Sequence, residues 1–284
     1  MLPAWTVRDV NGWPGRAEEN RGVRVKLWIE DPNHTLWLRK SPRARSPYEP
    51  AIECVALALA EASGVPAARA ELCEWNGSRG ILVRNFLNKP EELHGGDRVL
   101  GGFKEGYDPQ RYELHTPMLV YDALTARDPS GELWRAFVRM CAFDACIGNG
   151  DRHQGNWSLA IGPSGTRLAP LYDPAACLGV ELQSAHPLLG KPTEEAIDRY
   201  VSLCPSGFGD GRTRTKHEQA LAMLNTFPEW RDAASVVTLA VRHVVEHHLE
   251  AHLERAPSGW YAPEYQRLAV LLLRARLRRM ERFL

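Results

Sequence analysis

The sequence predicts an α/β (α+β) fold of two lobes, in which an N-terminal antiparallel sheet with one helix precedes a mainly helical lobe. Short runs of alternating apolar and polar residues, typical of half-buried strands, fill residues 1–90 and surround one helical segment. Over residues 91–284 the longer apolar runs recur at helical spacing. A chain of 284 residues is long for one domain but suits two lobes that share a cleft.

Composition excludes several classes of protein. Lys plus Arg equal Asp plus Glu at 35 each, so the net charge does not attract the chain to nucleic acid or to a membrane. No run approaches the roughly 20 apolar residues that a membrane helix needs, and the N-terminus lacks the apolar core of a signal peptide. The six cysteines show no C-x-x-C pair, which indicates reduced, buried thiols. We therefore expect a cytoplasmic protein without direct nucleic-acid contact.

The first lobe is predicted from the order of its strands. After a short extended start, strands are expected over residues 23–30, 35–40, 68–75 and 79–86, and the last two are joined by Asn76-Gly77, the strongest short hairpin signal. The alanine-rich segment 50–64 is predicted as the single helix, because it ends in the glycine that favours a helix C-cap.

The second lobe begins with a segment that has no clear periodicity. Residues 87–115 are polar and rich in glycine and charge, so we expect a hinge and a long loop, either at the entrance for an acceptor or as a surface excursion. Helices are predicted over 116–127 and 131–147, the second of them buried. Its Asp144 is interpreted as a structural acid that bonds the backbone of the following loop.

The ten residues 147–156, IGNGDRHQGN, carry the clearest chemical signal. Asp151 and Asn156 are five residues apart, and Asp173 follows after a predicted strand and one turn. Phosphoryl transfer needs an anionic acceptor for the proton of the attacking hydroxyl, and oxygen ligands that hold magnesium against the triphosphate. Asp151 fits the first role, whereas Asn156 and Asp173 fit the second.

This pattern, D-R-H-Q-G-N followed by L-Y-D, resembles the HipA-like kinases, an atypical branch of the protein-kinase-like fold. The loop also resembles that of phosphatidylinositol 3- and 4-kinases, but those continue to D-F-G where this chain reads Tyr172-Asp-Pro174, which favours the HipA-like family. The resemblance extends from about Gly22 to Leu182. It implies ATP and Mg²⁺ as cofactors, and a stand-alone catalytic unit, since no counterpart of the upstream HipA region precedes it.

Two charged residues of the first lobe fit the same family. Lys40 ends the strand 35–40, and Glu53 lies on the helix that follows. In kinases a lysine and a glutamate so placed form the ion pair that orients the cation toward the phosphates. The helix exit, Gly64-Val-Pro-Ala67, also resembles the HipA-like pattern.

The resemblance implies further nucleotide contacts. A phosphate-covering loop is expected before strand 23–30, with Arg21 and Gly22 nearest the phosphates. No G-x-G-x-x-G motif occurs there, and an ordinary hairpin connection is the alternative. Main-chain groups of Arg84 and Phe86 are expected to pair with adenine. His153 either contacts phosphate or bonds the loop backbone.

The remaining chain is predicted to be helical over 193–203, 213–227, 230–254 and 262–284, after a segment, 174–192, that replaces a kinase activation segment without its A-P-E signature. Four histidines, His243, His247, His248 and His252, include pairs at i, i+4 spacing that suit a metal. We interpret them as a polar helix face, because no cysteine or acid nearby completes a site.

The predicted function is an ATP-dependent kinase that transfers the γ-phosphoryl group to a hydroxyl, with Ser or Thr of a protein as the acceptor that the HipA-like resemblance implies. The alternatives are a lipid or small-molecule kinase, and a nucleotide-binding pseudokinase that acts as a regulatory module. The sequence does not identify the acceptor or any regulatory protein partner.

Overall fold

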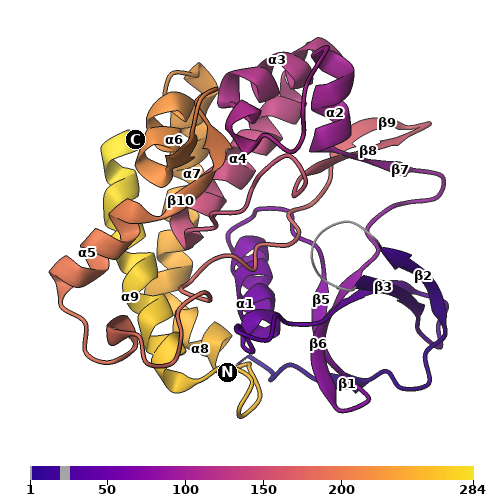
Figure 1. Cartoon of the computed structure of the whole chain (residues 1–284), viewed down its shortest axis with the longest axis vertical. Coiled ribbons are helices and arrows are strands. Elements are labelled where there is room, and N and C mark those ends of the chain that lie inside the picture. Colours follow the sequence, from indigo (N-terminus) through magenta and orange to yellow (C-terminus); the bar gives the residue numbers. More distant parts are fainter. Residues whose placement is uncertain (1, 20–25) are drawn as a thin grey trace.

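The computed structural model describes residues 2–19 and 26–284. Figure 1 shows a sheet and one helix in the lower right of the molecule and a mainly helical part above and to the left of them. The predicted mixed α/β class, with a sheet and one helix before a helical region, is therefore confirmed. The division between the lobes at residue 90 stays a prediction.

Six strands form the N-terminal sheet in the order β1-β5-β6-β4-β3-β2. They are β1 (Val7–Asp9), β2 (Gly15–Glu19), β3 (Lys26–Glu30), β4 (Leu36–Lys40), β5 (Ala70–Trp75) and β6 (Ser78–Arg84). Neighbouring strands are antiparallel except β1, which runs parallel to β5 with Val7 opposite Leu72. The prediction of an antiparallel sheet is wrong at this edge. Side chains alternate in the same way in parallel and antiparallel pairs, so the alternation in the sequence does not distinguish the two.

Helix α1 (Glu49–Ala62) covers one face of the sheet, as predicted for residues 50–64. Its Ile52, Val55 and Leu59 are fully buried in the same core cluster as Leu72 and Ile81 of the sheet. The opposite face has a smaller core that includes Ile29, Trp37 and Leu82. Successive side chains of each strand point to opposite faces of the sheet, so both faces of the sheet are apolar. Helix α1 packs on the face with the larger core.

Residues 87–115 do not form the predicted long loop. They contain β7 (Glu92–Gly95), α2 (Gly96–Phe103) and the 3-10 turn η1 (Tyr112–Leu114). β7 pairs with β8 (Ser158–Gly162), which pairs in turn with β9 (Gly165–Leu168). The sequence signal was weak because the partner of β7 lies far along the chain and the short helix α2 contains two glycines beyond its first residue.

Helix α4 (Glu132–Ile147) is the centre of the helical part and follows α3 (Pro117–Arg127), both as predicted. Trp134, Phe137 and Phe143 of α4 are fully buried. The helix ends at Gly148, whose φ of 71° is a left-handed conformation that glycine adopts without strain. This end directs residues 149–156 toward the N-terminal sheet.

The C-terminal helices pack on α4 or on one another. They are α5 (Glu194–Leu203), α6 (His217–Leu224), α7 (Pro228–His247), α8 (Leu249–Leu253) and α9 (Pro263–Met280), with 3-10 turns η2 (Pro187–Leu189) and η3 (Glu281–Phe283). In the described ranges, no helix is long and apolar enough to cross a lipid bilayer.

Two of the predicted C-terminal helices need correction. The segment 213–227 starts with β11 (Arg214–Lys216), which pairs with β10 (Pro205–Gly209) before α6 begins. The helix predicted over 230–254 is interrupted at His248, where φ is −135° and α8 starts. The first difference comes from the pairing of β11 with β10, which lies outside the segment predicted to be helical and which helical periodicity does not detect.

The N-terminal segment also contacts the C-terminal part (Figure 1), where the N-terminus lies beside α8. The N–H of Trp5 donates to the carbonyl of Arg255 at 2.8 Å. Arg79 of β6 donates to the carbonyl of Gly259 at 2.5 Å, and its guanidinium lies 4.7 Å from the ring centroid of Trp260. These contacts join the sheet to the helical part at a place remote from residues 85–91.

Candidate active site

A buried ion pair holds the loop that follows α4. Arg152, 2% exposed, donates from Nε to Asp144 Oδ2 at 2.7 Å and from its terminal nitrogen to Oδ1 at 3.1 Å. Asn149 Nδ2 donates to the same Oδ1 at 2.7 Å. Asp144 therefore holds the loop, as expected of a structural acid, but its carboxylate accepts from loop side chains, whereas loop backbone was expected. Arg152 also donates to the carbonyls of Asn156 and Tyr172.

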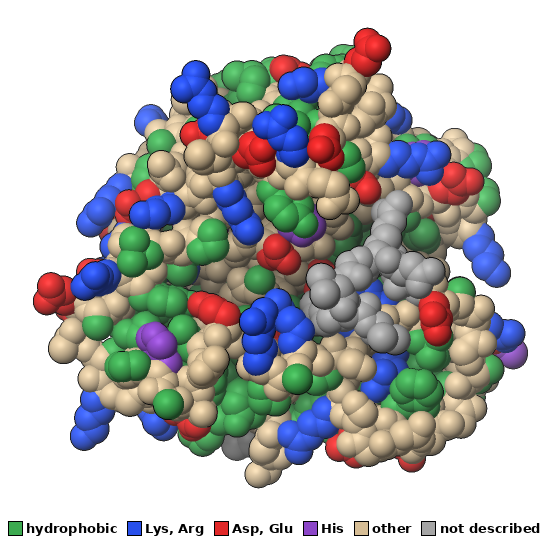
Figure 2. Space-filling view, viewed as in Figure 1, with side chains coloured by type: hydrophobic (Ala, Val, Ile, Leu, Met, Phe, Trp, Pro, Cys, Tyr) green, Lys and Arg blue, Asp and Glu red, His purple; other side chains and the backbone are tan. Residues whose placement is uncertain are grey.

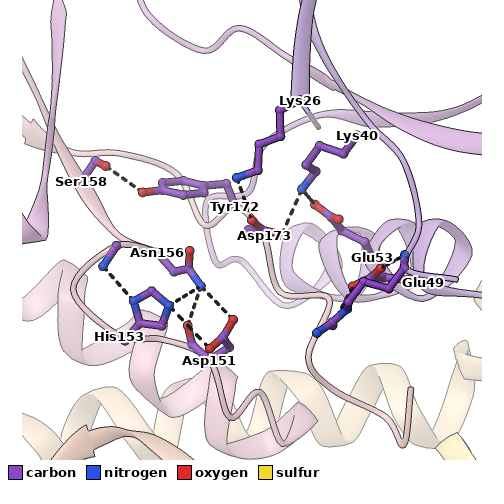
Figure 3. A network of polar contacts seen from close by, with 12 residues as sticks. Lys26, Lys40, Glu49, Glu53, Asp151, His153, Asn156, Ser158, Tyr172 and Asp173 are labelled. Atoms are coloured by element: carbon purple, nitrogen blue, oxygen red, sulfur yellow. Dashed lines mark hydrogen bonds and ion pairs between the residues drawn. The ribbon is translucent and has the colours of Figure 1, made fainter. Parts of the chain in front are cut away.

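The loop brings Asp151, His153 and Asn156 together (Figure 3). Asn156 Nδ2 donates to the carbonyl of Asp151 at 2.7 Å and to its Oδ2 at 3.2 Å. The Asp151 side chain is 46% exposed, so a substrate can reach its carboxylate. The face of the molecule in Figure 2 is hollowed near its centre, where acidic and basic side chains lie close together.

His153 bonds the loop backbone, one of its two predicted roles. Its Nδ1 accepts from the N–H of Gly155 at 3.0 Å, and its ring lies 4.7 Å from that of Tyr112. Burial lowers the pKa of His153, and the nearby Asp151 only partly opposes this effect. The imidazole is therefore neutral at pH 7, with Nε2 3.6 Å from Asp151 Oδ1. Contact of His153 with phosphate stays a prediction.

Lys40, Glu53 and Asp173 meet at the inner side of the sheet. Lys40 Nζ bonds Glu53 Oε1 of α1 and lies 3.1 Å from Asp173 Oδ1. Lys40 and Glu53 are 2% and 0% exposed. Asp173 has φ of 53°, a left-handed conformation that Asp tolerates better than most residues. Figure 3 shows Lys40 descending from β4 toward Asp173, with Glu53 rising from α1.

Lys26 is a site residue that the sequence reasoning missed. Its Nζ lies 3.6 Å from Asp173 Oδ2. Lys26 on β3 is directly opposite Lys40 on β4, so both side chains project from one face of the sheet. The alternation of residues 23–30 placed Lys26 on one face of its strand, but only the register between the two strands reveals its neighbour.

Arg214 is a second residue that was missed, since the segment 213–227 was predicted to be helical. From β11 it donates to the carbonyls of Gly150 and Ser206, the latter at 2.9 Å. A terminal nitrogen lies 4.0 Å from Asp151 Oδ1, and its guanidinium is 5.9 Å from the ring centroid of Tyr112. A cation thus stands beside the Asp151 carboxylate.

The end of β6 leads to the expected adenine contacts. The N–H of Arg84 donates to the carbonyl of Arg69 at 2.9 Å, and the carbonyl of Phe86 accepts from Arg167 at 3.0 Å. The ring of Phe86 stacks on Tyr172 with centroids 5.9 Å apart. Arg21 and Gly22, the expected phosphate neighbours, lie outside the described residues.

Comparison with known proteins identifies the family. Residues 20–260 match the HipA-like C-terminal domain. The chain belongs to this family. Family membership implies a protein-kinase-like phosphotransferase that uses ATP and a divalent metal. No curated protein matches this HipA-like chain in a sequence search.

Solved structures show which fold the HipA-like chain has. The proinflammatory kinase CtkA of Helicobacter pylori matches with a TM-score of 0.73 at 16% identity, over 96% of this chain and 95% of CtkA. The protein-kinase-like fold is thereby confirmed. HipA of Shewanella oneidensis MR-1, in a complex with HipB and operator DNA, matches at TM-score 0.45 and 15% identity, over 99% of this chain and 66% of that one. A CtTel1 dimer matches at TM-score 0.46 and 12% identity, over 94% and 11%.

The HipA-like site suits a nucleotide-bound magnesium ion better than a metal held by protein alone. No cluster of three or more His, Cys, Asp or Glu that could hold a metal occurs in residues 2–19 and 26–284, a range that includes the four histidines of α7 and α8 and the turn between them. Mg²⁺ in kinases takes one or two protein oxygens, with phosphates and waters as the remaining ligands. Asn156 turns its amide nitrogen to Asp151, which directs Oδ1 away from that carboxylate (Figure 3). Asn156 and Asp173 thus provide a fitting oxygen pair.

Proposed function

We propose that this chain is an ATP-dependent kinase that transfers the γ-phosphoryl group to a hydroxyl of Ser or Thr in a protein. The observation that carries the proposal is the position of Asp173. Its carboxylate meets Lys40 at 3.1 Å and Lys26 at 3.6 Å, and Arg152 links the residue before it to the loop of Asp151. The two lysines beside Asp173 can bind phosphate, and the accessible carboxylate belongs to Asp151. The Arg152 side chain connects the two segments that carry these groups.

On the nucleotide side, Lys40 and Lys26 bind phosphate oxygens, and Glu53 keeps the Lys40 ammonium in place. Asn156 and Asp173 hold the metal, and bound magnesium supplies positive charge to the β- and γ-phosphates. Adenine pairs with the carbonyl of Arg84 and the N–H of Phe86. The other main-chain group of each residue is already used, because the Arg84 N–H donates to the carbonyl of Arg69 and the Phe86 carbonyl accepts from Arg167.

On the acceptor side, Asp151 orients the hydroxyl and takes its proton. The hydroxyl oxygen forms a bond to the γ-phosphorus, while the bond from that phosphorus to the bridging oxygen of ADP breaks. Asn156 holds the Asp151 carboxylate by a bond of 3.2 Å, and Arg214 stands 4.0 Å away. Both contacts hold the Asp151 carboxylate at the surface that the hydroxyl approaches.

The acceptor class is tested by following the label from γ-labelled ATP. The purified protein is incubated with magnesium and, in separate arms, a cell protein fraction or phosphoinositide vesicles, with Asp151→Asn as the matched control. The proposal expects label on Ser or Thr of protein, absent with the variant. Label only on lipid supports a lipid kinase. ATP binding without transfer to either acceptor supports a pseudokinase.

A further inference from the structure

A cavity of about 630 Å³ lies beside α1, and none of the predicted site residues lines it. We call it the α1 cavity. Its walls are residues 4–6 and Arg8 of the N-terminal segment, one face of α1, residues 67–71 and Arg255. The α1 face consists of Cys54, Leu57, Ala58 and Glu61. Pockets of about 300–1,000 Å³ are the usual size for small ligands. The α1 cavity therefore has room for an organic molecule.

The cavity exists because the N-terminal segment separates from β5. The two run parallel from Val7, opposite Leu72, onward. Upstream of that point Trp5 N–H bonds the carbonyl of Arg255 at 2.8 Å, and Arg255 Nε bonds the carbonyl of Pro3 at 3.1 Å. These bonds join residues 3–5 to the helical part at Arg255, just after α8. The β5 side of the gap is lined by Ala67, Ala68 and Ala70, whose side chains are too short to fill it.

Three arginines and two glutamates line the α1 cavity, so its charge is positive overall. Arg8 and Arg69 share one carboxylate, Glu71, to which Arg69 bonds at 2.8 Å. Arg255 instead lies over the ring of Trp5, 4.7 Å from its centroid. A guanidinium beside an aromatic ring and aliphatic walls binds a planar anion well, since the cation takes the charged group and the ring takes the apolar part.

We propose that the α1 cavity is a binding site for a small organic anion, a carboxylate or phosphate attached to an apolar group, with Arg255 as the cation that receives it. The anionic group bonds the Arg255 guanidinium, and the apolar group packs on Trp5, Leu57 and the three alanines. The site is distinct from the nucleotide site. A ligand in this cavity contacts both α1 and Arg255 of the helical part, so the ligand bridges the two parts of the molecule. Helix α1 also carries Glu53.

The fluorescent probe 8-anilinonaphthalene-1-sulfonate, an aromatic anion, tests the site by titration of the full chain. We expect saturable binding of one probe per chain, unchanged by ATP with magnesium. Phenyl phosphate and benzoate, added separately as competitors, show whether phosphate or carboxylate is preferred. Displacement by ATP, or the lack of a saturable site, would overturn the proposal.

Two variants and one control locate the probe. Arg255→Gln removes the cation and Ala58→Trp fills the cavity, and each should weaken probe binding about tenfold or more. Arg79→Gln is the matched control, because Arg79 also lies 4.7 Å from an indole centroid but does not line the cavity. Circular dichroism verifies folding of each variant, and Ala58→Trp decides the matter if Arg255→Gln does not fold. Unchanged affinity in a folded Ala58→Trp protein contradicts the proposal.

Discussion

Arg152 and Asp144 form a two-point ion pair beneath the loop that carries Asp151, with nitrogen–oxygen distances of 2.7 and 3.1 Å. The same guanidinium donates to the carbonyl of Tyr172 at 2.9 Å, one residue before Asp173. One buried side chain therefore sets the separation between the loop and the segment of Asp173. The geometry of both halves of the proposed reaction depends on it.

Removal of Asp144 should destabilise the fold strongly. Asp144→Ala leaves the Arg152 guanidinium buried without its carboxylate, which costs about 3–5 kcal/mol. Urea unfolding measures the change. Glu194→Ala is the control, because the ion pair of Glu194 with Arg278 joins side chains that are 75% and 51% exposed; such pairs contribute about 0–1 kcal/mol. An equal decrease in the free energy of unfolding in the two variants would show that the Asp144–Arg152 pair stabilises the fold no more than an exposed ion pair does.

Lys40→Ala should weaken ATP binding about tenfold or more. The variant loses one charge-assisted hydrogen bond to phosphate, roughly 1.5–3 kcal/mol. Lys26→Ala should weaken binding in the same direction, and Glu53→Ala less than Lys40→Ala, because Glu53 acts only by orienting Lys40. Calorimetry measures each affinity, with Lys104→Ala at an exposed position as the control. Native affinity in Lys40→Ala would remove Lys40 from the phosphate site.

Asp173→Asn should abolish the magnesium-dependent stabilisation by ATP while the protein stays folded. Asparagine is the better replacement than alanine, because it also tolerates the φ of 53° at this position. ATP with magnesium should raise the melting temperature of the wild type, since a ligand that binds the native state stabilises it. A full shift in the variant would place the metal elsewhere.

Asp151→Asn should separate chemistry from binding. ATP affinity should stay near native, whereas turnover should fall by about two to three orders of magnitude, the usual contribution of a positioned base. Calorimetry and transfer of labelled phosphate give the two quantities, and a melting curve verifies the fold. A variant that loses ATP affinity and thermal stability together would make Asp151 a structural residue of the loop.

His115 should make stability depend on pH. Burial lowers its pKa to about 3, while Nδ1 donates to the carbonyl of Gly207 at 2.8 Å and Nε2 accepts from Trp157 at 3.1 Å. The unfolded chain, with a pKa of about 6.5, binds the proton first, so stability is full above pH 6.5 and falls on acidification. Between pH 7.5 and pH 5 the loss is about 2 kcal/mol.

The His115 contribution is isolated by comparison with His115→Gln, which has no titrating ring. Urea unfolding at pH 7.5 and pH 5 should show a loss that is smaller by about 2 kcal/mol in the variant than in the wild type. The same pH dependence in both proteins would mean that His115 is not held neutral by burial.

Local spacing was sufficient to predict that Asp151 and Asn156 share one loop, whereas their chemical roles stay a prediction. The segment that joins Asp151 to Asn156 is short, so the two residues stay near one another, and the structure has their side chains in contact at 3.2 Å. The prediction of Lys40 with Glu53 needed one further step, the packing of α1 on the sheet. An apolar helix after a strand makes that packing the expected one, because both elements must bury an apolar face.

The fold class, the helices α1, α3 and α4, and the residue types of the proposed reaction could be predicted from residue patterns within short segments. Three features became visible only in the folded chain: the register that places Lys26 opposite Lys40, the pairing of β11 that brings Arg214 to Asp151, and the parallel edge strand β1. These features depend on contacts between distant segments. Local residue patterns do not specify such contacts. Several strands could pair with a given strand, form the same backbone hydrogen bonds and bury the same apolar face.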